Sequence, residues 1–85
     1  MMDDSPVAMN VYGSPVTQAQ VEAIKSAMSG EFTLAELMQA AANTGLTYRV
    51  YYRAIDRLLQ RERRAGRIHY KGNGQWSEIA TPEAP

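Results

Sequence analysis

The fold of this chain is decided by residues 46–66, which read LTYRVYYRAIDRLLQRERRAG. On a helix at about 100° per residue, the apolar side chains of this stretch form one stripe, made of Val50, Tyr51, Ala54, Ile55, Leu58 and, at its margin, Leu59. The opposite side carries Arg49, Arg53, Gln60 and Arg64. The stretch therefore predicts an amphipathic helix over 47–65, with one side buried and a basic side that faces outward. Its apolar stripe thins after Leu59, where Gln60 to Arg64 is almost wholly polar, so the last turn is expected to project beyond the core.

The charges of the chain are unevenly distributed. The formal net charge is zero, but eight of the nine Lys and Arg residues lie between Arg49 and Lys71. That segment contains only two acids, Asp56 and Glu62, so it carries +6 and the remainder of the chain carries −6. Such an asymmetry creates a local positive field, and guanidinium groups favour phosphate and guanine. The alternative reading is an ordinary solvated helix face.

Length and composition bound the remaining possibilities. A chain of 85 residues makes one small domain, and without cysteine it has no disulfide or thiolate metal site. The N-terminus is acidic where a signal peptide is basic, and no apolar run approaches membrane-spanning length. We expect a soluble, cytoplasmic protein that does not contact a membrane.

Two helices are predicted before the basic one. Pro6, Gly13 and Pro15 lie in a region without sustained periodicity, so residues 1–14 are expected to be a mostly flexible arm. Part of this arm could dock on the domain through Val7, Met9, Val11 and Tyr12. Capping boxes start the helices at Thr17 and Thr33, each with Gln or Glu three residues later. The first helix is expected to stop at Gly30 and the second near Asn43.

The basic helix is followed by a pattern of period two. Residues 67–71 and 75–79 flank Asn73-Gly74, a strong signal for a two-residue hairpin turn. With that register, Ile68, Tyr70, Ser77 and Ile79 share the face that packs on the helices, which leaves Lys71 and Trp76 near the tip and more exposed. Trp76 is expected either to cover the edge of the core or to meet a partner. Residues 15–80 thus form the domain, and residues 81–85 are expected to be a disordered tail.

The order of these elements, and some local sequence, resembles the winged helix-turn-helix superfamily. Phe32-Thr33-Leu34-Ala35-Glu36-Leu37 looks like the entry to the second helix, residues 46–58 look like the third, and Ala65-Gly66-Arg67-Ile68 looks like the entry to the wing. The likeness spans residues 17–79, and Gln60 to Arg64 look like an extra turn. The resemblance implies an α+β winged helix: a three-helix bundle with a helix-turn-helix and a C-terminal β-hairpin wing. Small bacterial, phage or plasmid regulators have this format.

The resulting hypothesis is sequence-preferring binding of double-stranded DNA, by a small transcriptional regulator or DNA-associated accessory protein. Helix 47–65 would enter the major groove and hairpin 67–79 would act as the wing. Arg49 and Arg53 would read base edges. The other contacts, to phosphate, sugar or minor groove, are assigned to Tyr48, Tyr52, Arg57, Gln60, Arg64, Lys71, Asn73 and Gln75.

Other functions have less support in the sequence. The main alternative is a winged-helix interaction module, an adaptor or inhibitor that places its arginine face on an acidic protein; RNA binding is a third option. Asp56 is expected to pair with Arg53 one turn earlier. The single histidine, His69, lacks convergent partners, so no enzyme, metal, cofactor or small-molecule ligand is predicted. A homodimer would have to use the first helix, the arm or the wing.

Overall fold

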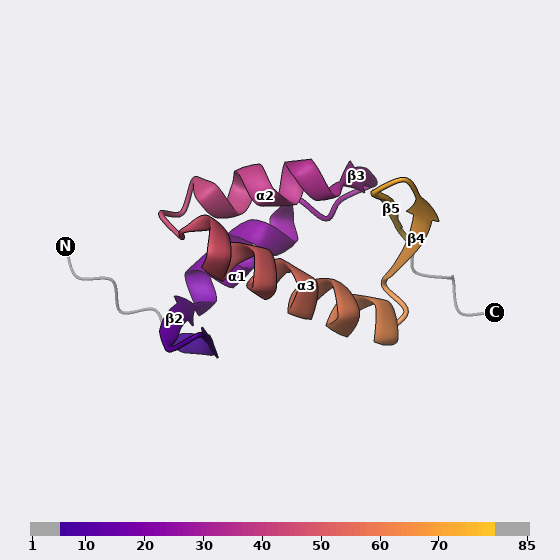
Figure 1. The fold of residues 1–85 in the computed structure, drawn as a ribbon. Helices are drawn as coiled ribbons and strands as arrows, with labels where there is room; N and C mark the ends of the chain where they lie inside the picture. Colours follow the sequence, from indigo (N-terminus) through magenta and orange to yellow (C-terminus); the bar gives the residue numbers. More distant parts are fainter. Residues whose placement is uncertain (1–5, 80–85) are drawn as a thin grey trace.

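The chain forms a small α+β domain, in which a computed structural model describes residues 6–79. The elements in order are β1 (Val7–Val11), β2 (Ser14–Thr17), α1 (Gln18–Ser26), β3 (Glu31–Thr33), α2 (Leu34–Ala42), α3 (Tyr48–Arg64), β4 (Ile68–Gly72) and β5 (Gln75–Glu78). Two antiparallel sheets are formed, β1-β2 and β3-β5-β4. The helices occupy the middle of the molecule, and the sheets lie at opposite ends (Figure 1).

The helix starts follow the capping pattern of the sequence. The Thr17 side chain accepts from the Gln20 amide at 3.1 Å, and the Gln20 side chain accepts from the Thr17 amide at 2.9 Å. Thr33 and Glu36 make the same pair of bonds, so both predicted capping boxes are confirmed. Thr47 occupies the third N-cap position but makes no side-chain cap bond.

The core lies between the three helices. The predicted apolar stripe of α3 is confirmed: Val50, Ala54, Ile55, Leu58 and Leu59 are buried, and Tyr51 is half-buried against the core. The first two helices add Val21, Ile24, Leu37 and Ala41. Side-chain periodicity was therefore sufficient to identify the buried side of α3.

The ends of α1 and α3 are set by different backbone bonds. α1 ends at Ser26 rather than near Gly30, because the amides of Ala27 and Met28 bond to carbonyls three residues earlier, as in a tight final turn. α3 ends in a Schellman motif. Gly66 has φ +79°, and the Arg67 amide donates to the Glu62 carbonyl at 3.0 Å.

The N-terminal region differs from the predicted flexible arm. Val7–Val11 pairs with Ser14–Thr17 in an antiparallel hairpin, and the side chains of Val11 and Val16 are fully buried. The two turn residues are Tyr12 and Gly13, with φ of +52° and +80°, as in a type I′ turn. The prediction of a flexible arm was wrong for residues 7–14, although the docking that the sequence allowed is confirmed for Met9 and Val11. Residues 1–5 lie outside the described part of the chain.

The β4–β5 hairpin has the predicted turn but not the predicted register. Asn73 and Gly74 have φ of +55° and +74°, which fits a type I′ turn. A bulge between Tyr70 and Gly72 shifts the pairing by one residue, so that Tyr70 is opposite Trp76. The shift places Trp76 on the same face as Ile68 and Tyr70, and Ile68 and Trp76 are buried there. Ile68 is therefore buried as predicted, whereas Tyr70 and Ile79 are exposed, contrary to the prediction.

The middle strand of the larger sheet joins the two halves of the chain. β5 pairs with β3 over Glu31↔Ser77 to Thr33↔Gln75, and with β4 on its other side. Two further backbone bonds extend this connection, from Glu78 to Gly30 at 2.7 Å and from Leu34 to Gly74 at 3.1 Å. The sheet thus fixes the start of α2 beside the hairpin that follows α3. The predicted tail, 81–85, lies outside the described residues.

Candidate nucleic-acid interface

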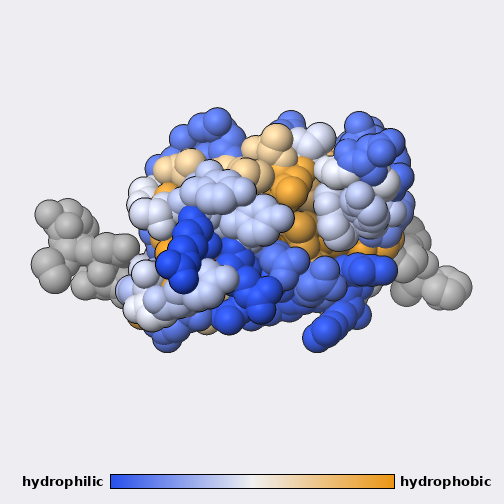
Figure 2. Space-filling model, in the orientation of Figure 1, coloured by the Kyte–Doolittle hydropathy of each residue, from blue (hydrophilic) through white to orange (hydrophobic). Residues whose placement is uncertain are grey.

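The outer side of α3 carries an arginine face, which we define as its six exposed arginines: Arg49, Arg53, Arg57, Arg61, Arg63 and Arg64. Hydrophilic residues gather over α3 and below it in Figure 2. A shallow hollow of about 460 Å³ on this side is lined by Arg53, Asp56, Arg57, Gln60, Arg61 and Arg64. A groove with this lining presents several guanidinium donors to one anionic ligand.

Seven of the ten sequence-predicted site residues lie on α3, namely Tyr48, Arg49, Tyr52, Arg53, Arg57, Gln60 and Arg64. All are exposed except Gln60, which is half-buried. The helical repeat brings them together because residues three or four apart are neighbours on a helix surface. Arg61 and Arg63 are equally exposed and extend the same surface, although the sequence interpretation had left them out.

Few acidic side chains neutralise the arginine face. Arg53 pairs with Asp56 at 3.3 Å, as predicted, but both side chains are about half exposed (50% and 49%). An exposed pair of this kind contributes about 0.2 to 1 kcal/mol, so a stronger anionic partner can replace it. Within residues 6–79, Arg61, Arg63 and Arg64 have no ion pair or side-chain hydrogen bond.

Two arginines of the face contact the β1–β2 hairpin. The Cζ atom of Arg49 lies 4.5 Å from the centroid of the Tyr12 ring, and Arg57 Nη1 donates to the Asn10 carbonyl at 2.9 Å. Neither contact involves a carboxylate, so the charge of each arginine is retained. The sequence interpretation missed Tyr12 and Asn10. The alternation of Met9 and Val11 ahead of a Tyr-Gly turn was the available signal.

Aromatic side chains border the arginine face on the side toward β4–β5. Tyr48, Tyr52 and Tyr70 are 58%, 49% and 50% exposed. Tyr52 and Tyr70 line a hollow of about 240 Å³ between α3 and the β4–β5 hairpin, together with Leu34, Asp56, Leu59, Gly74 and Trp76, whereas Tyr48 does not line it. An apolar area is visible there in Figure 2, between the helices and the β4–β5 end. The basic surface thus continues into an apolar one.

The three site residues that were predicted for the wing, Lys71, Asn73 and Gln75, lie on the β4–β5 hairpin, outside the α3 surface. Lys71 Nζ lies 2.6 Å from a carboxylate oxygen of Glu31, and this bond lowers the pKa of Glu31. Lys71 and Gln75 line a hollow together with Glu31 and Glu36, and none of its lining residues comes from α3. Asn73 is exposed at the hairpin turn. The structure therefore joins the α3 residues into one surface but gives Lys71 an acidic partner.

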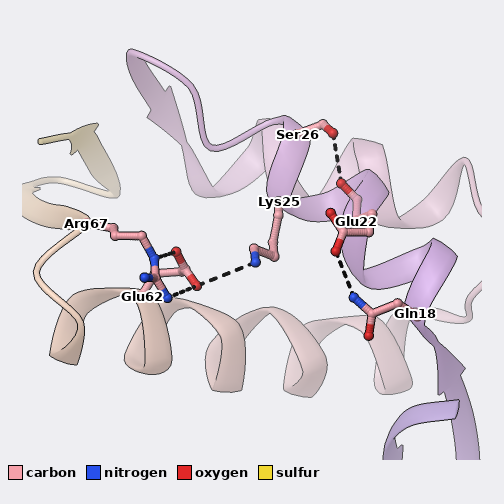
Figure 3. Close-up of polar contacts among 6 residues, drawn as sticks. All are labelled: Gln18, Glu22, Lys25, Ser26, Glu62 and Arg67. Carbon is pink, nitrogen blue, oxygen red and sulfur yellow. Dashed lines mark hydrogen bonds and ion pairs between the residues drawn. The ribbon is translucent and has the colours of Figure 1, made fainter. Parts of the chain in front are cut away.

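A buried carboxylate fixes the end of α3. Glu62 is 5% exposed, accepts from Arg67 Nε at 2.6 Å and Nη2 at 3.2 Å, and lies 3.9 Å from Lys25 Nζ on α1 (Figure 3). The hydrogen bonds from Arg67 lower the pKa of Glu62, against the opposing effect of burial. The expectation that the last turn of α3 projects beyond the core is thus wrong at Glu62. Charged partners, rather than apolar ones, hold it in place.

Glu62→Gln should destabilise the domain by about 1 to 2 kcal/mol at pH 7, because it removes a charge-assisted acceptor of two hydrogen bonds. A carboxyl group with a lowered folded-state pKa stabilises above its ordinary pKa, about 4.3, and this stabilisation is lost as the pH falls through the folded value. Urea unfolding of both proteins at pH 7 and pH 3 should show the difference between them shrinking at pH 3.

The matched control for this prediction is Glu22→Gln, at an exposed position of α1. That change should alter the free energy of unfolding by less than about 0.5 kcal/mol at pH 7. A Glu62→Gln difference of the same size at both pH values would contradict the role assigned to the ionised carboxylate.

The described residues give no sign of a metal site or of a membrane-spanning helix, and comparisons with known proteins give no match. Within residues 6–79, no group of three or more His, Cys, Asp and Glu side chains is suited to hold a metal ion. Across that same range, the helices lack the length and apolar character needed to cross a membrane. No family model, no curated protein and no solved structure matches this chain.

Proposed function

We propose that this chain is a winged helix-turn-helix domain that binds double-stranded DNA with sequence preference. The observation that carries the proposal is the arginine face, which has six exposed arginines on one helix. Within residues 6–79, only Arg53 of the six is paired with an acid, Asp56. The order of elements supports it: α2 and α3 are joined by a short turn, and the β4–β5 hairpin follows α3 and pairs with β3. A small transcriptional regulator or accessory protein fits this design.

The dimensions of α3 suit the major groove. A helix of 17 residues is about 25 Å long, and a groove about 12 Å wide admits one helix. In this arrangement Arg49 and Arg53 read base edges, while Tyr48, Tyr52 and Arg57 contact the backbone. Arg61 and Arg64 extend the phosphate contacts along the last turns. In the wing, Asn73 reaches the backbone more readily than Lys71, because Glu31 already pairs with Lys71.

The proposal is tested by fluorescence anisotropy with mixed-sequence duplexes over a salt titration. Each neutralised phosphate contributes about 0.9 to the slope of log affinity against log salt concentration, so five contacts predict a slope of about −4.5. We expect binding tighter than micromolar at low salt, with some duplexes favoured over others. Binding that is micromolar or weaker and independent of salt would overturn the proposal.

The exposed aromatic rings favour a second candidate, a protein-interaction module. Tyrosine is enriched at protein interfaces, and the exposed Tyr52 and Tyr70 line a partly apolar hollow next to the arginine face. Such a surface suits a partner with acidic and apolar side chains. This candidate predicts that charge reversal at Arg49 and Arg53 abolishes binding of a protein partner while the wild-type chain binds no duplex.

A further inference from the structure

The two hairpins of the domain have the same kind of turn with different residues at its first position. Asn73 has φ +55° and Tyr12 has φ +52°, and each is followed by glycine. This left-handed position in a type I′ turn favours Asn, Asp or Gly, and a bulky side chain there is uncommon. Asn73 is therefore a favoured residue for its turn, whereas the turn geometry gives no reason for a tyrosine at position 12.

The core does not explain Tyr12 either. Its side chain is 63% exposed, while the neighbouring Val11 is fully buried and provides the apolar contact of the strand. The ring instead lies against Arg49, with 4.5 Å between its centroid and the Cζ atom of the guanidinium. Backbone that is held in an unfavourable conformation at an exposed site is a reason to look for a functional role.

A second contact from the same hairpin points in the same direction. The Asn10 carbonyl accepts from Arg57, two helical turns after Arg49, at 2.9 Å. The hairpin thus contacts two guanidinium groups of the arginine face through a ring and a carbonyl, and both arginines stay exposed and charged. A segment that masked the arginine face would pair its arginines with carboxylates. The contacts of the β1–β2 hairpin instead restrict the motion of the Arg49 and Arg57 side chains and leave their positive charge available.

We propose that the β1–β2 hairpin is a second DNA-facing arm, in which Tyr12 is a positioning residue that holds the Arg49 guanidinium ready for DNA. This inference rests on the proposed function. An arginine side chain loses considerable rotamer freedom when it is fixed on a ligand, and a contact that restricts it beforehand reduces that loss. Within residues 6–79 the Arg49 guanidinium makes no hydrogen bond or ion pair, so its N–H donors are available for phosphate or guanine.

The test compares Tyr12→Asn with Tyr12→Phe, using a duplex selected for tight binding to the wild-type chain. Tyr12→Asn places the preferred residue in the turn, so its melting temperature should equal or exceed that of the wild type. Its affinity for the duplex should nevertheless fall about three- to five-fold, because the released Arg49 side chain must then lose its rotamer freedom on binding. Tyr12→Phe retains the ring and should bind like the wild type.

A double-mutant cycle identifies Arg49 as the residue through which Tyr12 acts. In the Arg49→Ala background, Tyr12→Asn should change the affinity by less than about 1.5-fold, because the side chain that it positions is gone. The inference is overturned if Tyr12→Asn binds as tightly as the wild type or more tightly, if Tyr12→Phe is as weak as Tyr12→Asn, or if the loss is the same in both backgrounds. A wild-type chain that binds no duplex refutes the proposed function itself and the inference with it.

Discussion

Replacing both Arg49 and Arg53 with glutamate should weaken duplex binding by at least about 100-fold. A bidentate arginine–guanine pair contributes about 1 to 3 kcal/mol of discrimination, and each glutamate adds repulsion from phosphate. Both side chains are exposed, so the fold should be retained. Anisotropy titrations measure the loss of affinity, and far-UV circular dichroism with a melting curve verifies that the double variant is folded.

The matched control for this prediction is the double lysine variant, Arg49→Lys with Arg53→Lys. It keeps the positive charge but removes the planar fork that binds guanine through two hydrogen bonds. We expect it to keep most of its affinity for random duplexes, with a similar salt dependence, and to lose the preference among sequences. A folded double glutamate variant that binds as tightly as the wild type would contradict the placement of α3 in the major groove.

Trp76→Ala should destabilise the domain by about 3 to 5 kcal/mol, the range for removing a large buried aromatic side chain. Trp76 is 8% exposed, and its ring lies 4.9 Å from that of Tyr70. For a domain of 85 residues, stability of roughly 0.1 kcal/mol per residue makes this loss comparable to about half of the total. Urea unfolding followed by circular dichroism measures the change.

Two variants of the same hairpin serve as references. Trp76→Phe keeps an aromatic ring in the core and should be clearly less destabilising. His69→Ala changes an exposed residue of β4 and should alter the free energy of unfolding by less than about 0.5 kcal/mol. If Trp76→Ala were as mild as His69→Ala, the bulged register that buries Trp76 would be wrong.

The helices could be predicted from the sequence because their signals are local. Thr17 with Gln20, and Thr33 with Glu36, lie within one turn of each other, and the stripe of α3 repeats at helical spacing. The faces of the β4–β5 hairpin could not be predicted in this way. A single bulged residue before the turn shifts the register, and the Asn-Gly signal itself does not reveal the bulge.

The candidate site also combines features that local sequence predicts with contacts that it does not predict. The exposed arginines of α3 followed from helical periodicity, since they share one segment of the chain. Their contacts with Tyr12 and Asn10 did not, because these residues are far away in the sequence and tyrosine is a poor indicator of a type I′ turn. Glu62 also looked like part of a solvated polar turn. Its burial depends on Lys25 and Arg67, whose positions only the packed fold reveals.

The central place of β5 has a consequence for the nascent chain. The helices and the first hairpin can form while β5 is still within the ribosome. At that stage β3 and β4 have no strand between them. Their unpaired amide and carbonyl groups, together with Phe32, are open to association with other chains until Gln75–Glu78 emerges. Termination before Gln75 would make that aggregation-prone state permanent, so the solubility of the domain depends on the synthesis of β5.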